Sequence, residues 1–70
     1  MQLRNDLKEV RMRMSVSQAE LGRITGISRS TVGRIERGQY MPSLRLAFRL
    51  AKKLGLRVDD IFYLEQTEQG

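Results

Sequence analysis

The chain has 70 residues, of which 40% are hydrophobic and 30% charged, and it contains neither cysteine nor histidine. This length suits a single domain with a small core, and this apolar fraction is not that of a disordered chain. Because it lacks cysteine and histidine, the chain cannot form disulfides, thiolate metal sites or the usual nucleophile–base pairs. We therefore expect no catalytic residue, no metal and no cofactor.

Basic residues outnumber acidic residues, with 13 Lys and Arg against 8 Asp and Glu, a net charge of +5 and a pI near 10.5. This balance is typical of domains that bind nucleic acid, although a basic domain without an anionic partner has the same composition. There is no export signal and no apolar stretch long enough to cross a bilayer. We expect a cytoplasmic protein with no membrane partner.

Apolar residues recur at helical spacing from Leu3 through Leu7 and Val10 to Met14, which predicts a first helix over about 3–13. No segment shows the period-two alternation of a strand, and no internal repeat is present. The sequence therefore predicts helices only.

Two further helices are predicted on either side of a tight turn. Ser17 and Glu20 form a capping box that starts the second helix, and Gly26 is a natural left-handed residue to end it. Ser28 can cap a third helix over about 28–37. Helices joined by so short a glycine-containing turn cross at a steep angle, roughly 90–120°.

The rest of the chain predicts two more helices and a tail. Ser43 caps a fourth helix that ends at Gly55, and a short fifth helix is expected over about 59–65. Asp59 and Asp60 suit the positive end of its dipole better than they suit a metal pair. The prediction is a compact all-α domain of five helices over residues 1–64, followed by a polar tail over residues 65–70.

The third helix has two unlike faces, because successive residues turn by about 100°. Val32 and Ile35 lie on the apolar face with Ser28. The opposite face holds Ser30, Gly33, Arg34 and Arg37, with Arg29 at its flank. An arginine there can offer two parallel donors to a guanine edge; contact with phosphate or water alone is the alternative.

The turn between the second and third helices has the steric pattern of a DNA-binding helix-turn-helix. Gly22 lies where the two helices approach, Gly26 makes the turn, and apolar residues fill the space beneath. The segment SQAELGRITGISRSTVGRIERGQYMPSLRLAFRLAKKLGLRVDDIF resembles the Xre-type family, typified by phage lambda Cro and the lambda and 434 repressors. The resemblance covers about residues 5–64 and implies a five-helix, lambda repressor-like domain whose third helix enters the major groove.

The resemblance also implies roles for individual residues. It implies base contacts by Arg29, Ser30 and Arg34. It implies contacts with the DNA backbone by Gln18, Thr31, Arg37, Gln39, Tyr40 and Ser43. It further implies a buried ion pair between Arg11 and Glu36, for which a plain exposed glutamate is the alternative.

Three positions depart from the family pattern. Ser15 stands where glycine is common, and Arg57 where a capping Ser or Asp is usual, so the turns at both positions are in question. Gly33 stands where larger polar residues are common. We interpret Gly33 as a site of close approach between helix and groove; a tolerated glycine in an exposed helix is the alternative.

The apolar run Ile61–Leu64 suggests a partner surface. On a helix, four successive residues span about 300°, so they cannot all face one small core. We expect Phe62, Tyr63 and Leu64 to contribute to a homodimer interface. The alternative is that the last turn unwinds and all four residues pack against the first and fourth helices.

Together these features predict sequence-specific binding of double-stranded DNA by a small transcriptional regulator. We expect a repressor that binds an inverted-repeat operator as a homodimer and associates with the nucleoid when bound. The alternative is an antitoxin-type module that binds a partner protein and also its own operator. An enzyme is the least supported class.

Overall fold

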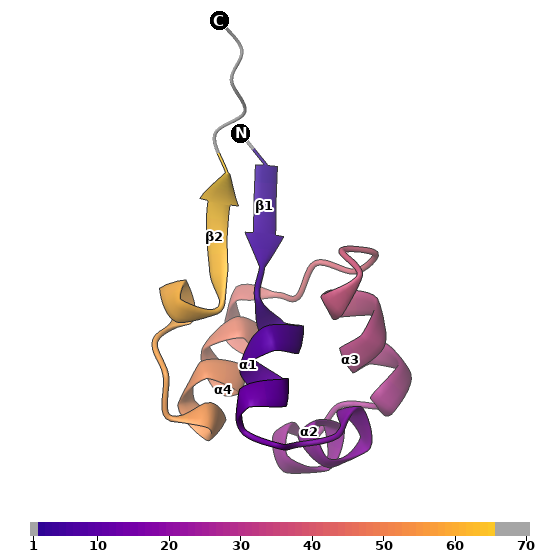
Figure 1. Cartoon of the computed structure of the whole chain (residues 1–70). Helices are drawn as coiled ribbons and strands as arrows, with labels where there is room; N and C mark the ends of the chain where they lie inside the picture. The colour runs from indigo at the N-terminus through magenta and orange to yellow at the C-terminus, as the bar shows by residue number, and fades with distance from the viewer. Residues whose placement is uncertain (1, 66–70) are drawn as a thin grey trace, which may run out of the picture.

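The computed structural model describes residues 2–65 and contains four α-helices, one 3-10 turn and two strands. In chain order they are β1 (Gln2–Asn5), α1 (Leu7–Arg13), α2 (Gln18–Thr25), α3 (Arg29–Glu36), α4 (Leu44–Leu54), the 3-10 turn η1 (Val58–Asp60) and β2 (Phe62–Glu65) (Figure 1). The helices gather in one body. The two strands run antiparallel and extend from that body as a ribbon (Figure 1).

Helices α2, α3 and α4 each begin directly after the capping serine that the sequence predicted. The Ser17 hydroxyl accepts the Glu20 amide at 3.0 Å, and the Glu20 carboxylate accepts the Ser17 amide at 3.1 Å, which completes the capping box. Ser28 and Ser43 each accept the amide three residues later at 3.1 Å. These bonds satisfy backbone donors that a helix start otherwise leaves unpaired, so the predicted starts are confirmed.

Helix α2 packs tightly against the turn that follows it and against the first residue of α3. A Cβ on the buried Gly22 would come within 2.6 Å of the Ile27 carbonyl oxygen, so no larger residue fits without a backbone shift. The turn then passes through Gly26, which adopts the left-handed conformation with a φ of 80°. Close contact and turn together fix the angle between the two helices.

One cluster of buried apolar side chains joins the four helices to the base of the ribbon. Its members are Leu7, Val10, Leu21, Val32, Ile35, Ala47, Leu50, Ala51, Leu54, Ile61 and Phe62. Burying a side chain of this size contributes about 1.5–3 kcal/mol, so the cluster is the main source of stability for so short a chain.

The prediction of a five-helix, all-α domain is wrong at both ends of the chain. Residues 3–5 belong to β1, so the first helix begins at Leu7. The expected fifth helix over 59–65 is replaced by η1 and β2, and Leu3 pairs with Leu64 across the ribbon. Glu65, which we assigned to the polar tail, is the last residue of β2; residues 66–70 of that tail lie outside the described part.

Side-chain bonds of Asn5 explain why β1 does not continue the helix. The Asn5 Oδ1 accepts the Leu7 amide at 3.0 Å, and the Nδ2 donates to the Ile35 carbonyl at 2.9 Å. The next amide, that of Asp6, donates to the Ile61 carbonyl at 2.8 Å. Asn5 therefore starts α1 and ties the ribbon to α3.

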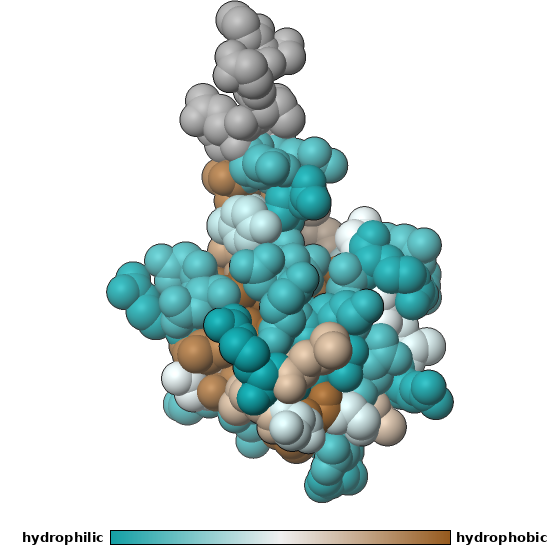
Figure 2. Space-filling model, in the orientation of Figure 1, coloured by the Kyte–Doolittle hydropathy of each residue, from teal (hydrophilic) through white to brown (hydrophobic). Residues whose placement is uncertain are grey.

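The ribbon has one apolar and one polar face, because side chains alternate along a strand and opposite residues share a face. Leu3 and Leu64 lie on the same face as Phe62. On the other face Arg4 and Glu65 form an ion pair at 2.7 Å. Figure 2 shows hydrophobic surface beside the ribbon, whereas most of the visible surface is hydrophilic.

The apolar run divides between core and surface, as expected for four successive apolar residues beside one small core. Ile61 is fully buried and Phe62 is only 8% exposed, so Phe62 packs in the core of the chain and not on the surface that we expected to be left for a partner. Tyr63 and Leu64 are 41% and 61% exposed, so the alternative in which all four residues pack inward is wrong. Desolvation and the neighbouring Asp6 carboxylate, which accepts from the phenol at 3.3 Å, raise the pKa of Tyr63.

The two other departures from the family pattern have local solutions. Ser15 adopts the left-handed conformation that glycine would provide, with a φ of 57°. The start of η1 lacks a capping side chain at Arg57, but the Arg57 amide donates to the Asp60 carboxylate at 2.9 Å. Both turns therefore form, the first with a strained residue.

Candidate nucleic-acid interface

Helix α3 presents one buried and one exposed face. Val32 and Ile35 are fully buried in the core, whereas Arg29, Ser30 and Arg34 are exposed. The three residues that the resemblance assigned to base contacts therefore lie on the exposed surface of one helix. The apolar side holds that surface in a fixed orientation.

The arginines of this surface are not engaged by carboxylates. Within residues 2–65, the ion pairs involve Arg4, Arg11 and Arg57, and none involves Arg29 or Arg34. A free guanidinium is a planar, permanently charged group with parallel donors that match phosphate oxygens or a guanine edge. The exposed face of α3 thus carries unneutralised positive charge.

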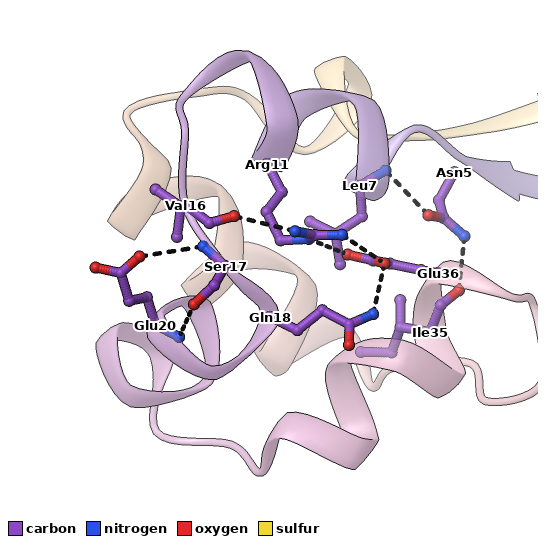
Figure 3. Close-up of polar contacts among 9 residues, drawn as sticks. All are labelled: Asn5, Leu7, Arg11, Val16, Ser17, Gln18, Glu20, Ile35 and Glu36. Atoms are coloured by element: carbon purple, nitrogen blue, oxygen red, sulfur yellow. Dashed lines mark hydrogen bonds and ion pairs between the residues drawn. The ribbon is translucent and has the colours of Figure 1, made fainter.

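A largely buried ion pair connects α3 to α1. The Arg11 Nε lies 2.7 Å from Glu36 Oε2, and the two side chains are only 13% and 4% exposed (Figure 3). Arg11 also donates through Nη2 to Glu36 Oε1 at 3.3 Å and through Nη1 to the Val16 carbonyl at 3.1 Å. Arg11 and Glu36, expected to pair, therefore connect α1 to the end of α3.

Gln18 joins the same network from α2. Its Nε2 donates to Glu36 Oε1 at 3.0 Å, as Figure 3 shows. The carboxamide oxygen and the second N–H of Nε2 take no part in this bond. Gln18, expected to touch the DNA backbone, is thus held in place by Glu36 and keeps polar capacity for a ligand.

Gly33 lies on the polar face of α3, where the helical wheel placed it, but it is not exposed there. We expected it on the exposed face, but it is buried because the side chains of Gln18 and Arg37 cover it. A Cβ on Gly33 would lie 3.1 Å from Nη1 of Arg37 and 3.4 Å from Nε2 of Gln18. The glycine makes room for two other candidate residues.

The remaining backbone-contact candidates lie at the start of α3 and in the loop after it. Thr31 is half-buried and bonds its hydroxyl to that of Ser28 at 2.8 Å. Gln39 accepts from the Arg37 Nε at 3.2 Å, and Tyr40 is 42% exposed beside the ribbon. The Ser43 hydroxyl caps α4, as described above.

Two residues that position this surface were not found from the sequence. Asn5 fixes the start of α1 and bonds the end of α3; an Asn–Asp pair before the first buried leucine was a usable capping signal. Arg49 of α4 donates to the Thr25 carbonyl at the end of α2, at 3.4 Å. No local pattern predicts that second contact.

The described residues contain no group of three or more side chains that could hold a metal ion. None of the helices described is both long and apolar enough to span a bilayer.

Comparison with known families assigns the chain to a helix-turn-helix family. The family model described as helix-turn-helix, HTH_3, matches residues 7–61, which extend from α1 to the residue before β2. The chain belongs to the HTH_3 helix-turn-helix family. This confirms the resemblance on which the residue roles were based, and the strands of the ribbon lie outside the matched part of this helix-turn-helix protein.

Relatives and solved structures agree with this assignment. An uncharacterized HTH-type transcriptional regulator of Bacillus subtilis, YgzD, is 42% identical over 64 residues, covering 91% of this chain and 97% of the relative. A second such regulator, MJ0272 of Methanocaldococcus jannaschii, is 42% identical over 66 residues, covering 94% and 100%. The restriction-modification controller protein C.AhdI of Aeromonas hydrophila superposes with a TM-score of 0.73 at 37% identity, covering 77% and 82% of the two chains.

Proposed function

We propose that this helix-turn-helix protein is a sequence-specific double-stranded DNA-binding regulator of transcription, acting as a repressor. One observation carries the proposal: α3 exposes Arg29, Ser30 and Arg34 with no carboxylate partner among residues 2–65, while its other face is anchored in the core. A rigid helix with free guanidinium groups is suited to the major groove, where such groups discriminate bases.

The proposal divides the surface into two roles. Arg29, Ser30 and Arg34 read base edges, and each good bidentate contact with guanine contributes about 1–3 kcal/mol of discrimination. The backbone phosphates are held by residues around this helix, namely Gln18, Thr31, Arg37, Gln39, Tyr40 and Ser43. Phosphate contacts fix the position of the protein and add affinity for any sequence.

The protein acts as a homodimer in this proposal, through the outer half of the ribbon. Leu64 and Tyr63 are exposed, and Leu3 lies opposite Leu64 on the apolar face, 38% exposed. A two-stranded ribbon is marginally stable alone in water, and a partner that covers Leu3 and Leu64 would bury apolar surface at its free end. A two-fold dimer would place its two α3 helices about 34 Å apart on an inverted repeat.

Selection of bound duplexes from a random pool tests this function. We expect enrichment of one inverted-repeat sequence, bound about a thousandfold more tightly than unrelated DNA at physiological salt. The affinity should fall steeply as salt rises, because bound phosphates release counterions. Recovery of no preferred sequence, or binding that salt does not change, would contradict the proposal.

A second candidate function rests on apolar side chains of α4 and the loop before it. Met41, Leu44 and Phe48 are 67%, 72% and 59% exposed, which is a large exposed apolar area for so small a protein. An antitoxin-type module that binds both a partner protein and its own operator would cover them. A stoichiometric complex that Phe48→Glu dissociates, with operator binding unchanged, would favour this second function.

A further inference from the structure

The burial of Gly33 within an exposed row of α3 points to a specific arrangement. The place that a side chain at Gly33 would fill is occupied from α2 by the Gln18 carboxamide and from the end of α3 by the Arg37 guanidinium. The glycine therefore brings together side chains from two elements. Any larger residue at this position must move one or both of them.

Each of the two side chains is held by a second group. Gln18 donates to Glu36, whose carboxylate is paired with Arg11, so the carboxamide cannot turn freely away from α3. Arg37 donates through Nε to Gln39 at 3.2 Å. In residues 2–65 no carboxylate lies within ion-pair distance of Arg37, so its charge is unneutralised.

The geometry suits one anion held by two donors. Nη1 of Arg37 and Nε2 of Gln18 both lie within 3.4 Å of the Cβ position of Gly33, so they are at most twice that distance apart. Charge-assisted bonds of about 2.8 Å from both nitrogens can reach the two free oxygens of one phosphodiester. The nearby Glu36 carboxylate opposes an anion only weakly, because Arg11 already neutralises it.

We propose that Gly33 is a positioning residue: its missing side chain seats Gln18 and Arg37 together as a clamp for one DNA backbone phosphate. The inference rests on the proposed DNA-binding function and deepens it. It differs from the close-approach interpretation, in which the backbone at Gly33 faces the groove directly.

Substitutions at Gly33 in two backgrounds test the clamp. In the otherwise unchanged protein, Gly33→Leu should weaken binding of the selected operator about tenfold and lower the salt slope by about one unit. Gly33→Ala should weaken binding about threefold, and should raise the thermal midpoint by a few degrees because alanine favours helix. Both losses should be equal for all DNA sequences.

The same substitutions in a Gln18→Ala/Arg37→Ala background provide the control. If Gly33 acts through these two side chains, neither substitution should weaken binding further by more than about twofold. Equal losses in both backgrounds would overturn the inference and support direct approach of the glycine to DNA. Unchanged affinity and salt slope in the first background would also overturn it, since the glycine would then be merely tolerated.

A neutral phosphate analogue identifies the ligand. Operators that carry one methylphosphonate at successive positions should show one site per half-operator where the unmodified protein loses about tenfold in affinity. The Gln18→Ala/Arg37→Ala variant should lose no affinity at that site, and Gly33→Leu should lose little affinity there. The clamp is wrong if the unmodified protein binds its operator but loses no more affinity than the variants at any methylphosphonate position. The proposed function would still stand in that case. If the unmodified protein binds no operator, the proposed function itself fails.

Discussion

At the residue scale, the network behind α3 differs in kind from the ion pairs on the surface. Arg11 and Glu36 are largely buried, whereas the side chains of Arg4 and Glu65 in the ribbon are 52% and 49% exposed. Removing one partner of a buried pair leaves a charge that water cannot reach, and an exposed pair is screened by solvent. The two pairs therefore form a matched comparison.

We predict that Arg11→Met lowers the free energy of unfolding by about 3 kcal/mol. The control Arg4→Met, which breaks the exposed pair, should lower it by no more than about 0.5 kcal/mol. Urea unfolding followed by circular dichroism measures both values. Similar losses for the two variants would mean that Glu36 does not depend on Arg11.

Among residues 2–65, Ser15 is the non-glycine residue with a positive φ. A substitution at this position can therefore remove backbone strain. We predict that Ser15→Gly raises the free energy of unfolding by about 1 kcal/mol, because glycine adopts this conformation without a Cβ clash. Ser15→Ala, which retains the clash, is the control and should bring no gain. A gain from alanine alone would point to helix propensity instead.

At the scale of elements, local signals were sufficient for the middle of the chain but not for its ends. Serine caps and turn glycines are read within a few residues, and they located α2, α3 and α4 correctly. The ribbon depends on pairing between Leu3 and Leu64, which no local pattern reveals. The run Ile61–Leu64 is apolar throughout, and such runs are ambiguous between helix and strand.

The site was predictable to a similar degree. The exposed positions of Arg29, Ser30 and Arg34 follow from helical periodicity alone. The burial of Gly33 does not, because it depends on how side chains from α2 and from the end of α3 fold over the helix. A helical wheel describes one helix in isolation, so it omits such covering side chains.

The ribbon makes a prediction about assembly. Leu64→Glu should convert the proposed dimer into a monomer, because it places a charge within the apolar face. Met12→Glu on α1 is a matched control, since Met12 and Leu64 are both 61% exposed. Sedimentation equilibrium at tens of micromolar distinguishes the two. A wild-type monomer under these conditions, or equal effects of both variants, would contradict an interface on the ribbon.

At the scale of the whole molecule, charge and fold act together. The net charge of +5 attracts any polyanion, and within residues 2–65 the arginines engaged in ion pairs lie off α3, so those of α3 have no ion-pair partner in that part of the chain. In the proposed function, long-range attraction gives affinity for any sequence, and the braced, exposed face of α3 adds discrimination. Affinity and specificity should therefore respond to different substitutions.

The central claim is that the exposed face of α3 reads bases while its neighbours hold the backbone. Its most direct test compares Arg34→Ala with Arg37→Ala on the selected operator and on a set of single-base variants of it. Arg34→Ala should relax the preference at one position of each half-site, and Arg37→Ala should weaken binding to every sequence alike and lower the salt slope by about one unit. If the two variants change the base preference and the salt slope in the same way, the division into base-contacting and phosphate-contacting residues is wrong.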